Sequence, residues 1–164
     1  MVINAATIPY LGPIVDADLS AWDKTMEVNL KGPFLLSSLC AKKMAAANGG
    51  SIINVSSVAG LNAAPMQGIY SISKAGMIML TKVMARELGR QKVRVNCICP
   101  GLIKTQLSEA MWSNPELERT TVAAKALGRI GSTDELVGAA IYLASDASSF
   151  TTGAMIQVDG GMMI

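Results

Sequence analysis

The sequence predicts an α/β fold, a doubly wound parallel sheet with helices on both faces. The first observation behind this prediction is that short β-branched or apolar runs alternate with long segments of helical spacing. The second is that these runs are apolar along almost their whole length, as in strands buried on both faces. The third is size and composition: 164 residues, 51% hydrophobic and 16% charged, suit one domain with a sizeable core. We therefore expect a single domain over residues 1–164.

Four short runs predict the strands. They are Val2–Asn4, Ser51–Val55, Val93–Cys99 and Ala154–Val158. The segments between them are long enough for the helical crossovers that parallel strands need.

Two helical segments are expected between the first two strands. The segment SAWDKTMEVNL begins at Ser20, and Asp23 follows three residues later, a pattern that resembles a capping box. The segment FLLSSLCAKKMAAA continues it after Gly32-Pro33, where we expect the helix to kink.

Two further helices are expected later in the chain. The longest, QGIYSISKAGMIMLTKVMARELG, ends near Gly89, which would cap it. Residues 100–126 predict a loop with one or two short helices. The last helix runs from about Thr133 to Ser145 and opens with a capping-box pattern at Ser132 and Glu135. Its expected apolar stripe consists of Leu136, Val137, Ala140, Ile141 and Leu143.

Composition excludes several classes of function. A net charge of +2 is too small for a nucleic-acid-binding surface. No apolar run reaches the roughly 18 to 20 residues of a membrane span, and the first residues lack the charged and apolar regions of a signal peptide. We therefore expect a cytoplasmic protein that binds neither nucleic acid nor membrane.

Cysteine and histidine usage narrows the chemistry. Cys97 and Cys99 alternate along an apolar run, so we expect buried thiols on one face of a strand. With only this C-x-C pair and no histidine, we expect no metal site. The lack of histidine also excludes Ser-His-Asp and Cys-His catalysis.

The predicted fold indicates where a ligand would bind. In open parallel sheets, ligands bind outside the carboxyl ends of the strands. The residues that follow the first three predicted strands are Ala5-Ala6, Ser56-Ser57 and Pro100-Gly101.

The stretch YSISK places Tyr70 and Lys74 one helical turn apart, with no carboxylate beside the lysine. A surface helix with a solvated lysine would explain the pair. The alternative is that the ammonium lowers the pKa of the phenol, which suits proton transfer to and from an oxygen. Ser57, thirteen residues before Tyr70, and Asn29, at the expected kink, favour the second interpretation.

The set Asn29, Ser57, Tyr70 and Lys74 resembles the catalytic residues of the short-chain dehydrogenases/reductases, which have a Rossmann-like fold. The resemblance covers the whole chain. Five motifs carry it in the family's order: VINAA at residues 2–6, NVSSVAG, YSISK, RVNCICPGLIKT and TGAMIQVDGG.

The resemblance implies a role for each residue of this set. Tyr70 would be the general acid/base, and Lys74 would lower its pKa and bind the nicotinamide ribose. Ser57 would orient the substrate carbonyl, and Asn29 would anchor a water in a proton relay to Lys74.

The resemblance also implies a nicotinamide cofactor, NADP or NAD. PGLIKT and the nearby Met-Trp resemble the carbonyl reductase branch, which favours NADP. The residues expected to contact the cofactor are Asn4, Ala5, Tyr70, Lys74, Pro100, Gly101, Ile103 and Thr105.

Substrate and partners follow from the same resemblance. The chain would interconvert a ketone or aldehyde and an alcohol. Residues 103–126 resemble the family's mobile lid, whose Leu, Met and Trp residues either favour an apolar substrate or simply pack. The helices around residues 33–47 and 67–89 resemble those that pair subunits, so we expect a homodimer or homotetramer.

The family's opening strand, glycine-rich turn and helix have no counterpart in these 164 residues. We therefore expect a truncated domain with strands four to seven of the family order, which are contiguous in that sheet. The first strand would be an exposed edge. Two functions stay open: the catalytic portion of an oxidoreductase, or an inactive homologue that acts only through association.

Overall fold

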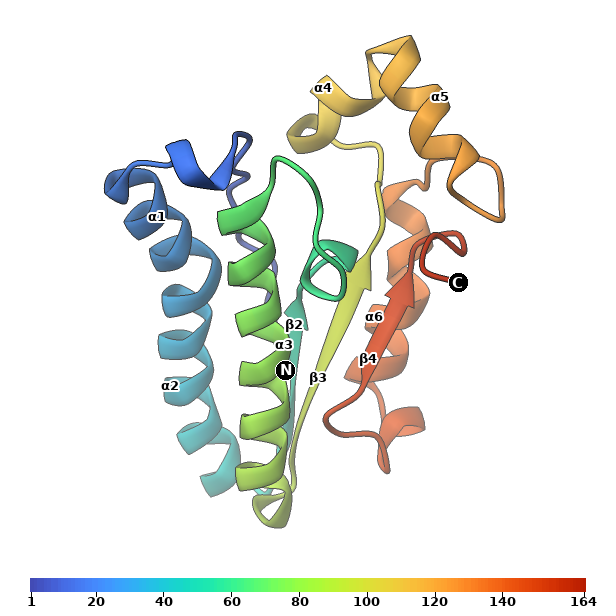
Figure 1. The fold of residues 1–164 in the computed structure, drawn as a ribbon. Coiled ribbons are helices and arrows are strands. Elements are labelled where there is room, and N and C mark those ends of the chain that lie inside the picture. Colours follow the sequence, from blue (N-terminus) through green and yellow to red (C-terminus); the bar gives the residue numbers. More distant parts are fainter.

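The computed structural model describes all 164 residues and contains one four-stranded sheet (Figure 1). Its strands are β1 (Val2–Asn4), β2 (Gly50–Val55), β3 (Val93–Pro100) and β4 (Met155–Val158). They lie in the order β1-β2-β3-β4, and every neighbouring pair is parallel. The predicted fold class and all four strands are confirmed, and β1 is an edge strand of this sheet.

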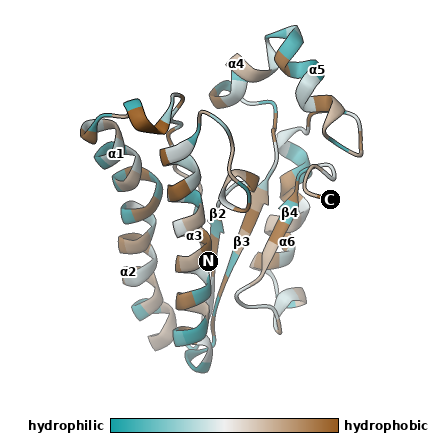
Figure 2. Ribbon diagram, viewed as in Figure 1, coloured by the Kyte–Doolittle hydropathy of each residue, from teal (hydrophilic) through white to brown (hydrophobic).

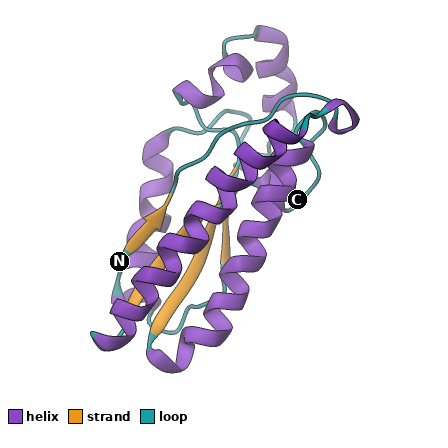
Figure 3. Ribbon diagram, turned by 90° about the vertical axis from the view of Figure 1, so that its left-hand side faces the viewer, coloured by secondary structure: helices purple, strands orange, loops and turns teal.

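Helices cover both faces of the sheet. On one face lie α1 (Leu19–Met26), a π-helical turn (Glu27–Lys31), α2 (Gly32–Ala46) and α3 (Gly68–Leu88). Figure 3 shows this face, with long helices crossing in front of the strands. On the other face lies α6 (Val137–Ala144).

Neighbouring residues of β2 form the two halves of the core. Successive strand side chains point to opposite faces, so Ile52 packs with Ala41 and Met84 on the side of α2 and α3. Ile53 packs instead with Leu143 of α6. Figure 2 shows the apolar colouring along β3 and β4 between these layers.

Two short helices, α4 (Glu109–Trp112) and α5 (Pro115–Ala123), stand above the carboxyl edge of the sheet, as predicted for residues 100–126 (Figure 1). Single 3-10 turns complete the fold at Ile14–Asp16, Val58–Gly60, Gly89–Gln91, Gln106–Ser108, Thr133–Leu136 and Asp146–Ser148. No helix of the chain is both long and apolar enough to cross a membrane.

The first helix begins earlier than predicted. Asp18 is its N-cap, and its Oδ1 accepts hydrogen bonds from the Ala21 N–H at 2.8 Å and the Ser20 hydroxyl at 2.6 Å. The expected Ser20–Asp23 capping box is therefore wrong, because the acidic side chain before Ser20 already caps the helix.

The kink before Gly32-Pro33 is present as the π-helical turn Glu27–Lys31. Pro33 has no N–H, so the carbonyl of Asn29, four residues earlier, lacks its usual α-helical donor. The sequence therefore places a widened turn at Asn29, one of the predicted site residues.

The ends of α3 and α6 differ in part from expectation. Gly89 keeps a helical φ of −57°, and Lys92 takes the left-handed conformation instead, with φ 61°. The Ser132/Glu135 capping box is confirmed. Of the expected α6 stripe, Leu143 is buried but Ile141 is 63% exposed, since a helix of eight residues turns only one narrow face to the sheet.

Candidate active site

The four predicted catalytic residues gather at the carboxyl edge of the sheet. Ser57 lies two residues after β2, and Tyr70 and Lys74 lie in the first two turns of α3. Asn29 lies in the π-helical turn that packs against α3. Three separate segments therefore bring these side chains together, as parallel-sheet topology predicts.

Ser57 and Tyr70 form the polar centre of this site. Ser57 caps the 3-10 turn Val58–Gly60, and its Oγ accepts a hydrogen bond from the Ala59 N–H at 3.1 Å. Burial raises the pKa of the Tyr70 phenol, while hydrogen bonding to Ser57 and Thr7 acts in the opposite direction. The phenol is therefore protonated at neutral pH, the form that can donate a proton.

Lys74 is buried, with 1% of its surface exposed, so the solvated-lysine interpretation is wrong. Its Nζ donates to the Val55 carbonyl at 2.9 Å and lies 5.6 Å from the centroid of the Tyr70 ring. Burial lowers the pKa of Lys74 to about 8. The net pKa of Tyr70 is raised rather than lowered, because burial of the phenol outweighs the effects that act in the opposite direction.

The Asn29 side chain is fully buried and fully hydrogen-bonded. Its Oδ1 accepts from the Ile8 N–H at 2.8 Å, and its Nδ2 donates to the Ile8 carbonyl at 2.9 Å and to Ser73 Oγ at 3.1 Å. The amide thus has little capacity left for a water molecule. The Asn29 backbone carbonyl lacks its α-helical donor, because Pro33 has no N–H.

Two further serines hold the site in place: Ser56, which was expected at the ligand-binding edge without a role, and Ser73, which sequence reasoning missed. Ser73 Oγ donates to the Tyr70 carbonyl at 2.7 Å, and Ser56 Oγ donates to the Lys74 carbonyl at 2.8 Å. Both are buried. The signal was present for Ser73, because a serine inside a helix bonds the carbonyl three or four residues earlier.

Gly60 allows the loop after β2 to pack closely on α3. A Cβ at this position would lie 2.6 Å from the carbonyl carbon of Lys74 and 2.8 Å from its oxygen. Only a residue without a side chain fits there, so the glycine of NVSSVAG has a packing reason.

The residues expected at the adenosine side differ in what they can offer. The Asn4 Nδ2 donates to Ser37 Oγ at 2.8 Å and to Asn54 Oδ1 at 2.7 Å, and the residue is buried. Its amide nitrogen thus ties β1 to β2 and α2, and the side-chain oxygen and the backbone remain for a ligand. Ala5 is exposed at the end of β1.

The residues expected at the nicotinamide end form one loop after β3. Pro100 is the last residue of that strand, and Gly101 packs so tightly that a Cβ would lie 2.8 Å from the Asp159 Cα. The Ile103 N–H makes no hydrogen bond within the chain. Thr105 caps the 3-10 turn that leads into α4.

Cys97 and Cys99 are fully buried on β3, as predicted, with their sulfur atoms 3.8 Å apart. Hydrogen bonding to Cys97 and burial raise the pKa of the Cys99 thiol. The pair packs with Ile78 of α3 and with Leu61.

The parallel sheet with helices on both faces defines a Rossmann-like α/β domain, and comparison with known proteins gives the family. Residues 1–163 match a family model described as Enoyl-(Acyl carrier protein) reductase. The chain belongs to the short-chain dehydrogenase/reductase family.

Two curated relatives illustrate the likeness. The chain is 38% identical over 163 residues to Dehydrogenase/reductase SDR family member 4 of Bos taurus, covering 99% of this chain and 58% of the relative. It is 39% identical over 165 residues to 3-oxoacyl-[acyl-carrier-protein] reductase FabG of Thermotoga maritima, covering 100% of this chain and 66% of the relative. The chain thus spans under two thirds of the length of these relatives.

Solved structures of dehydrogenases also match the fold of this chain. A gluconate 5-dehydrogenase from Burkholderia cenocepacia in complex with NADP and tartrate matches with a TM-score of 0.96 and 35% identity, over 98% of this chain and 64% of that one. A 4-hydroxyisoleucine dehydrogenase complexed with NADH matches with a TM-score of 0.95 and 38% identity, over 99% of this chain and 68% of that one.

Proposed function

We propose that residues 1–164 contain the catalytic centre of an NAD(P)-dependent oxidoreductase that interconverts a ketone or aldehyde and an alcohol. The observation that carries this proposal is the partly buried Tyr70 phenol, which lies near the Ser57 hydroxyl and whose ring centroid is 5.6 Å from Nζ of the buried Lys74 ammonium. A proton donor, a hydroxyl and a fixed positive charge at one strand end suit reversible reduction of a carbonyl.

In the proposed reaction, Tyr70 donates its proton to the carbonyl oxygen during reduction and takes it back during oxidation. Ser57 binds the same oxygen. The raised pKa of Tyr70 favours the protonated form. The Lys74 ammonium stabilises the phenolate that forms, because an opposite charge is close to it in a poorly solvated site.

The free hydrogen-bonding groups at this edge fit a nicotinamide cofactor, which supplies or accepts the hydride when bound. The Lys74 ammonium has three donors and one acceptor within the chain, the Val55 carbonyl. Its other donors are available for ribose hydroxyls. The unpartnered Ile103 N–H is available for the nicotinamide carboxamide.

The lid composition favours a largely apolar substrate. Leu107, in the 3-10 turn before α4, and Leu117, on α5, are 52% and 40% exposed. The helices α4 and α5 stand above the carboxyl edge (Figure 1). Trp112, in contrast, is part of the packing, since its Nε1 donates to the Thr105 carbonyl at 3.0 Å. The leucines therefore carry the substrate argument and the tryptophan does not.

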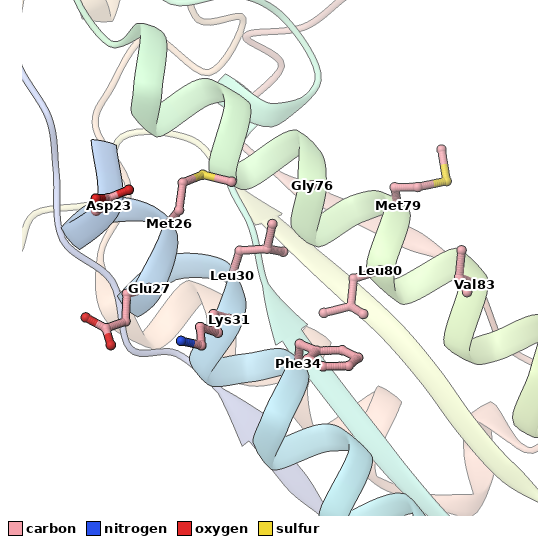
Figure 4. A pocket seen from close by; sticks show the side chains of 10 residues that line it. All are labelled: Asp23, Met26, Glu27, Leu30, Lys31, Phe34, Gly76, Met79, Leu80 and Val83. Atoms are coloured by element: carbon pink, nitrogen blue, oxygen red, sulfur yellow. The ribbon is translucent and has the colours of Figure 1, made fainter. Parts of the chain in front are cut away.

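The helices that cover the sheet favour self-association. A groove of about 840 Å³ runs between the α1–α2 segment and α3 (Figure 4). Apolar side chains make up most of its lining: Met26, Leu30, Phe34, Met79, Leu80 and Val83. We propose a homo-oligomer that buries this surface.

The test is a turnover assay on the full-length translation product that contains residues 1–164. Purified protein is mixed with NADPH or NADH and a panel of ketones, aldehydes and 3-oxoacyl thioesters, and loss of the reduced cofactor is followed. We expect turnover of at least one apolar ketone. Failure to bind either cofactor, or binding without turnover of any carbonyl class, would contradict the proposal.

A further inference from the structure

Lys125, which follows α5, is a buried cation that the proposed chemistry does not use. Only 6% of its surface is exposed. Its Nζ donates to the Leu102 carbonyl at 3.0 Å, and it takes part in neither of the two salt bridges of the chain. Burying an ammonium is unfavourable unless its surroundings compensate, so this position calls for an explanation.

The Leu102 carbonyl is held by two donors from the same segment. Besides Lys125, the Gly131 N–H donates to it at 3.2 Å. The Lys104 N–H in turn donates to the Gly131 carbonyl at 2.9 Å. The segment 125–131 therefore fixes the loop after β3 on both sides of Ile103, at Leu102 and Lys104.

Asp159, at the end of β4, supports this loop from the other side. It lines the same cavity of about 380 Å³ as Lys125, Leu102 and Ile103. Its Oδ1 accepts from the Gly161 N–H at 2.9 Å, whereas Oδ2 is buried without a hydrogen bond. The carboxylate thus offsets the charge of Lys125 across the cavity, opposing the lowering of the lysine pKa by burial.

The held carbonyl determines where the next N–H points. In a trans peptide the C=O and the following N–H point in opposite directions, and the chain has no cis peptide bonds. Since the Leu102 carbonyl faces Lys125 and Gly131, the Ile103 N–H faces away from them. This is the N–H that has no partner within the chain.

We infer that Lys125 is a positioning residue for the cofactor: its buried ammonium holds the Leu102 carbonyl and thereby presents the Ile103 N–H to the nicotinamide carboxamide. The inference rests on the proposed nicotinamide site. Lys125 lies outside the predicted catalytic set. In this inference it affects the binding of the nicotinamide end of the dinucleotide and not of the ADP-ribose end.

The experiment therefore compares a ligand that contains nicotinamide with one that lacks it. In the full-length translation product, the dissociation constants of NADPH or NADH and of the matching ADP-ribose, which lacks nicotinamide, are measured by titration calorimetry. Lys125→Met should weaken binding of the dinucleotide about tenfold, the typical effect of losing one hydrogen bond. Binding of ADP-ribose should be unchanged. Lys125→Arg, which keeps a charged donor, should restore most of the difference, and Lys82→Met on the exposed side of α3 should change neither.

Each outcome decides the matter. Equally weakened binding of both ligands would show a general structural role for Lys125 and overturn the inference. Unchanged binding of the dinucleotide would also overturn it. If Lys125→Met does not fold, Lys125→Gln, which keeps an uncharged donor, is held to the same comparison of the two ligands. A wild-type protein that binds neither ligand would instead refute the proposed function itself.

Discussion

Tyr70 and Lys74 differ in how far the sequence could describe them. Their spacing in YSISK correctly places both on one helix face beside Ser57. The sequence could not predict that the Lys74 ammonium bonds the Val55 carbonyl, because that contact depends on how α3 lies across the end of β2. For the same reason, pattern alone predicted a lowered phenol pKa, whereas burial raises it.

Replacing Tyr70 with Phe removes the proton that the proposed reaction transfers and little else. We expect Tyr70→Phe to abolish turnover, with kcat below a tenth of the wild-type value, while the cofactor dissociation constant changes little. Steady-state kinetics and calorimetry on the full-length translation product measure the two effects. A variant that retains more than a tenth of kcat would rule out the general acid/base role.

Lys74 should make stability depend on pH in a defined direction. Its pKa is about 8 in the folded chain against an ordinary value of 10.5, so between these values the unfolded state binds more protons. The wild-type free energy of unfolding should therefore rise with pH across this window relative to Lys74→Met, by up to about 3 kcal/mol, and the difference should be flat below pH 8.

Urea unfolding of both proteins between pH 7 and pH 10 measures this difference. Lys82→Met, an exposed lysine on the same helix, is the matched control and should show no such slope. A difference between wild type and Lys74→Met that falls with pH would mean that the ammonium gains more from its surroundings than it loses by burial.

Among the elements, the strands were the most predictable and the helix ends the least. Short apolar runs mark all four strands, and the two central strands, β2 and β3, are buried on both faces, which leaves little choice of residue there. Helix ends depend on single side chains. Asp18 rather than Ser20 is the N-cap of α1, and Lys92 rather than Gly89 takes the left-handed conformation after α3.

The strand β3 should protect its thiols. Cys97 and Cys99 have no exposed surface, while Cys40 on α2 is partly exposed. We expect a thiol reagent to label Cys40 first, and the other two only as the chain unfolds. Labelling followed by mass spectrometry, in native buffer and in urea, checks this. Rapid native labelling at both β3 positions would contradict their burial.

At the scale of the molecule, the resemblance accounted for the strand order and for the residues at the carboxyl edge. It could not account for Lys125 and Asp159 lining one cavity, because only Asp159 lies in a motif of the family. The two residues come near each other because the segment after α5 folds back beside β4. Contacts between segments this far apart depend on loop paths, which local patterns do not encode.

The groove along α2 and α3 should control the oligomeric state. Phe34 is 48% exposed and lines this groove. We expect Phe34→Asp to weaken self-association by at least tenfold, because a buried carboxylate without a partner is strongly unfavourable. Analytical ultracentrifugation over a range of concentrations measures it. Val15→Asp, at an exposed position outside the groove, should leave association unchanged.

Residues 1–164 alone should bind NADPH or NADH far more weakly than the complete FabG of Thermotoga maritima. These residues include no glycine-rich turn between a strand and a helix to bind the pyrophosphate. Losing several charge-assisted hydrogen bonds, each of about 1.5 to 3 kcal/mol, should raise the dissociation constant by several orders of magnitude. Titration calorimetry measures this dissociation constant. A low micromolar constant would mean that the phosphates of the cofactor bind at another position on the chain.

Lys74 is held at both of its ends by consecutive residues of one segment. Its side chain bonds the Val55 carbonyl, and its own carbonyl accepts from Ser56. This closed ring couples strand and helix rigidly, so Ser57 and Tyr70 should keep their separation as the molecule fluctuates. If Ser57 and Tyr70 act as proposed, folding preorganises this pair, and the reorganisation energy of the proton transfer is kept low before any substrate arrives.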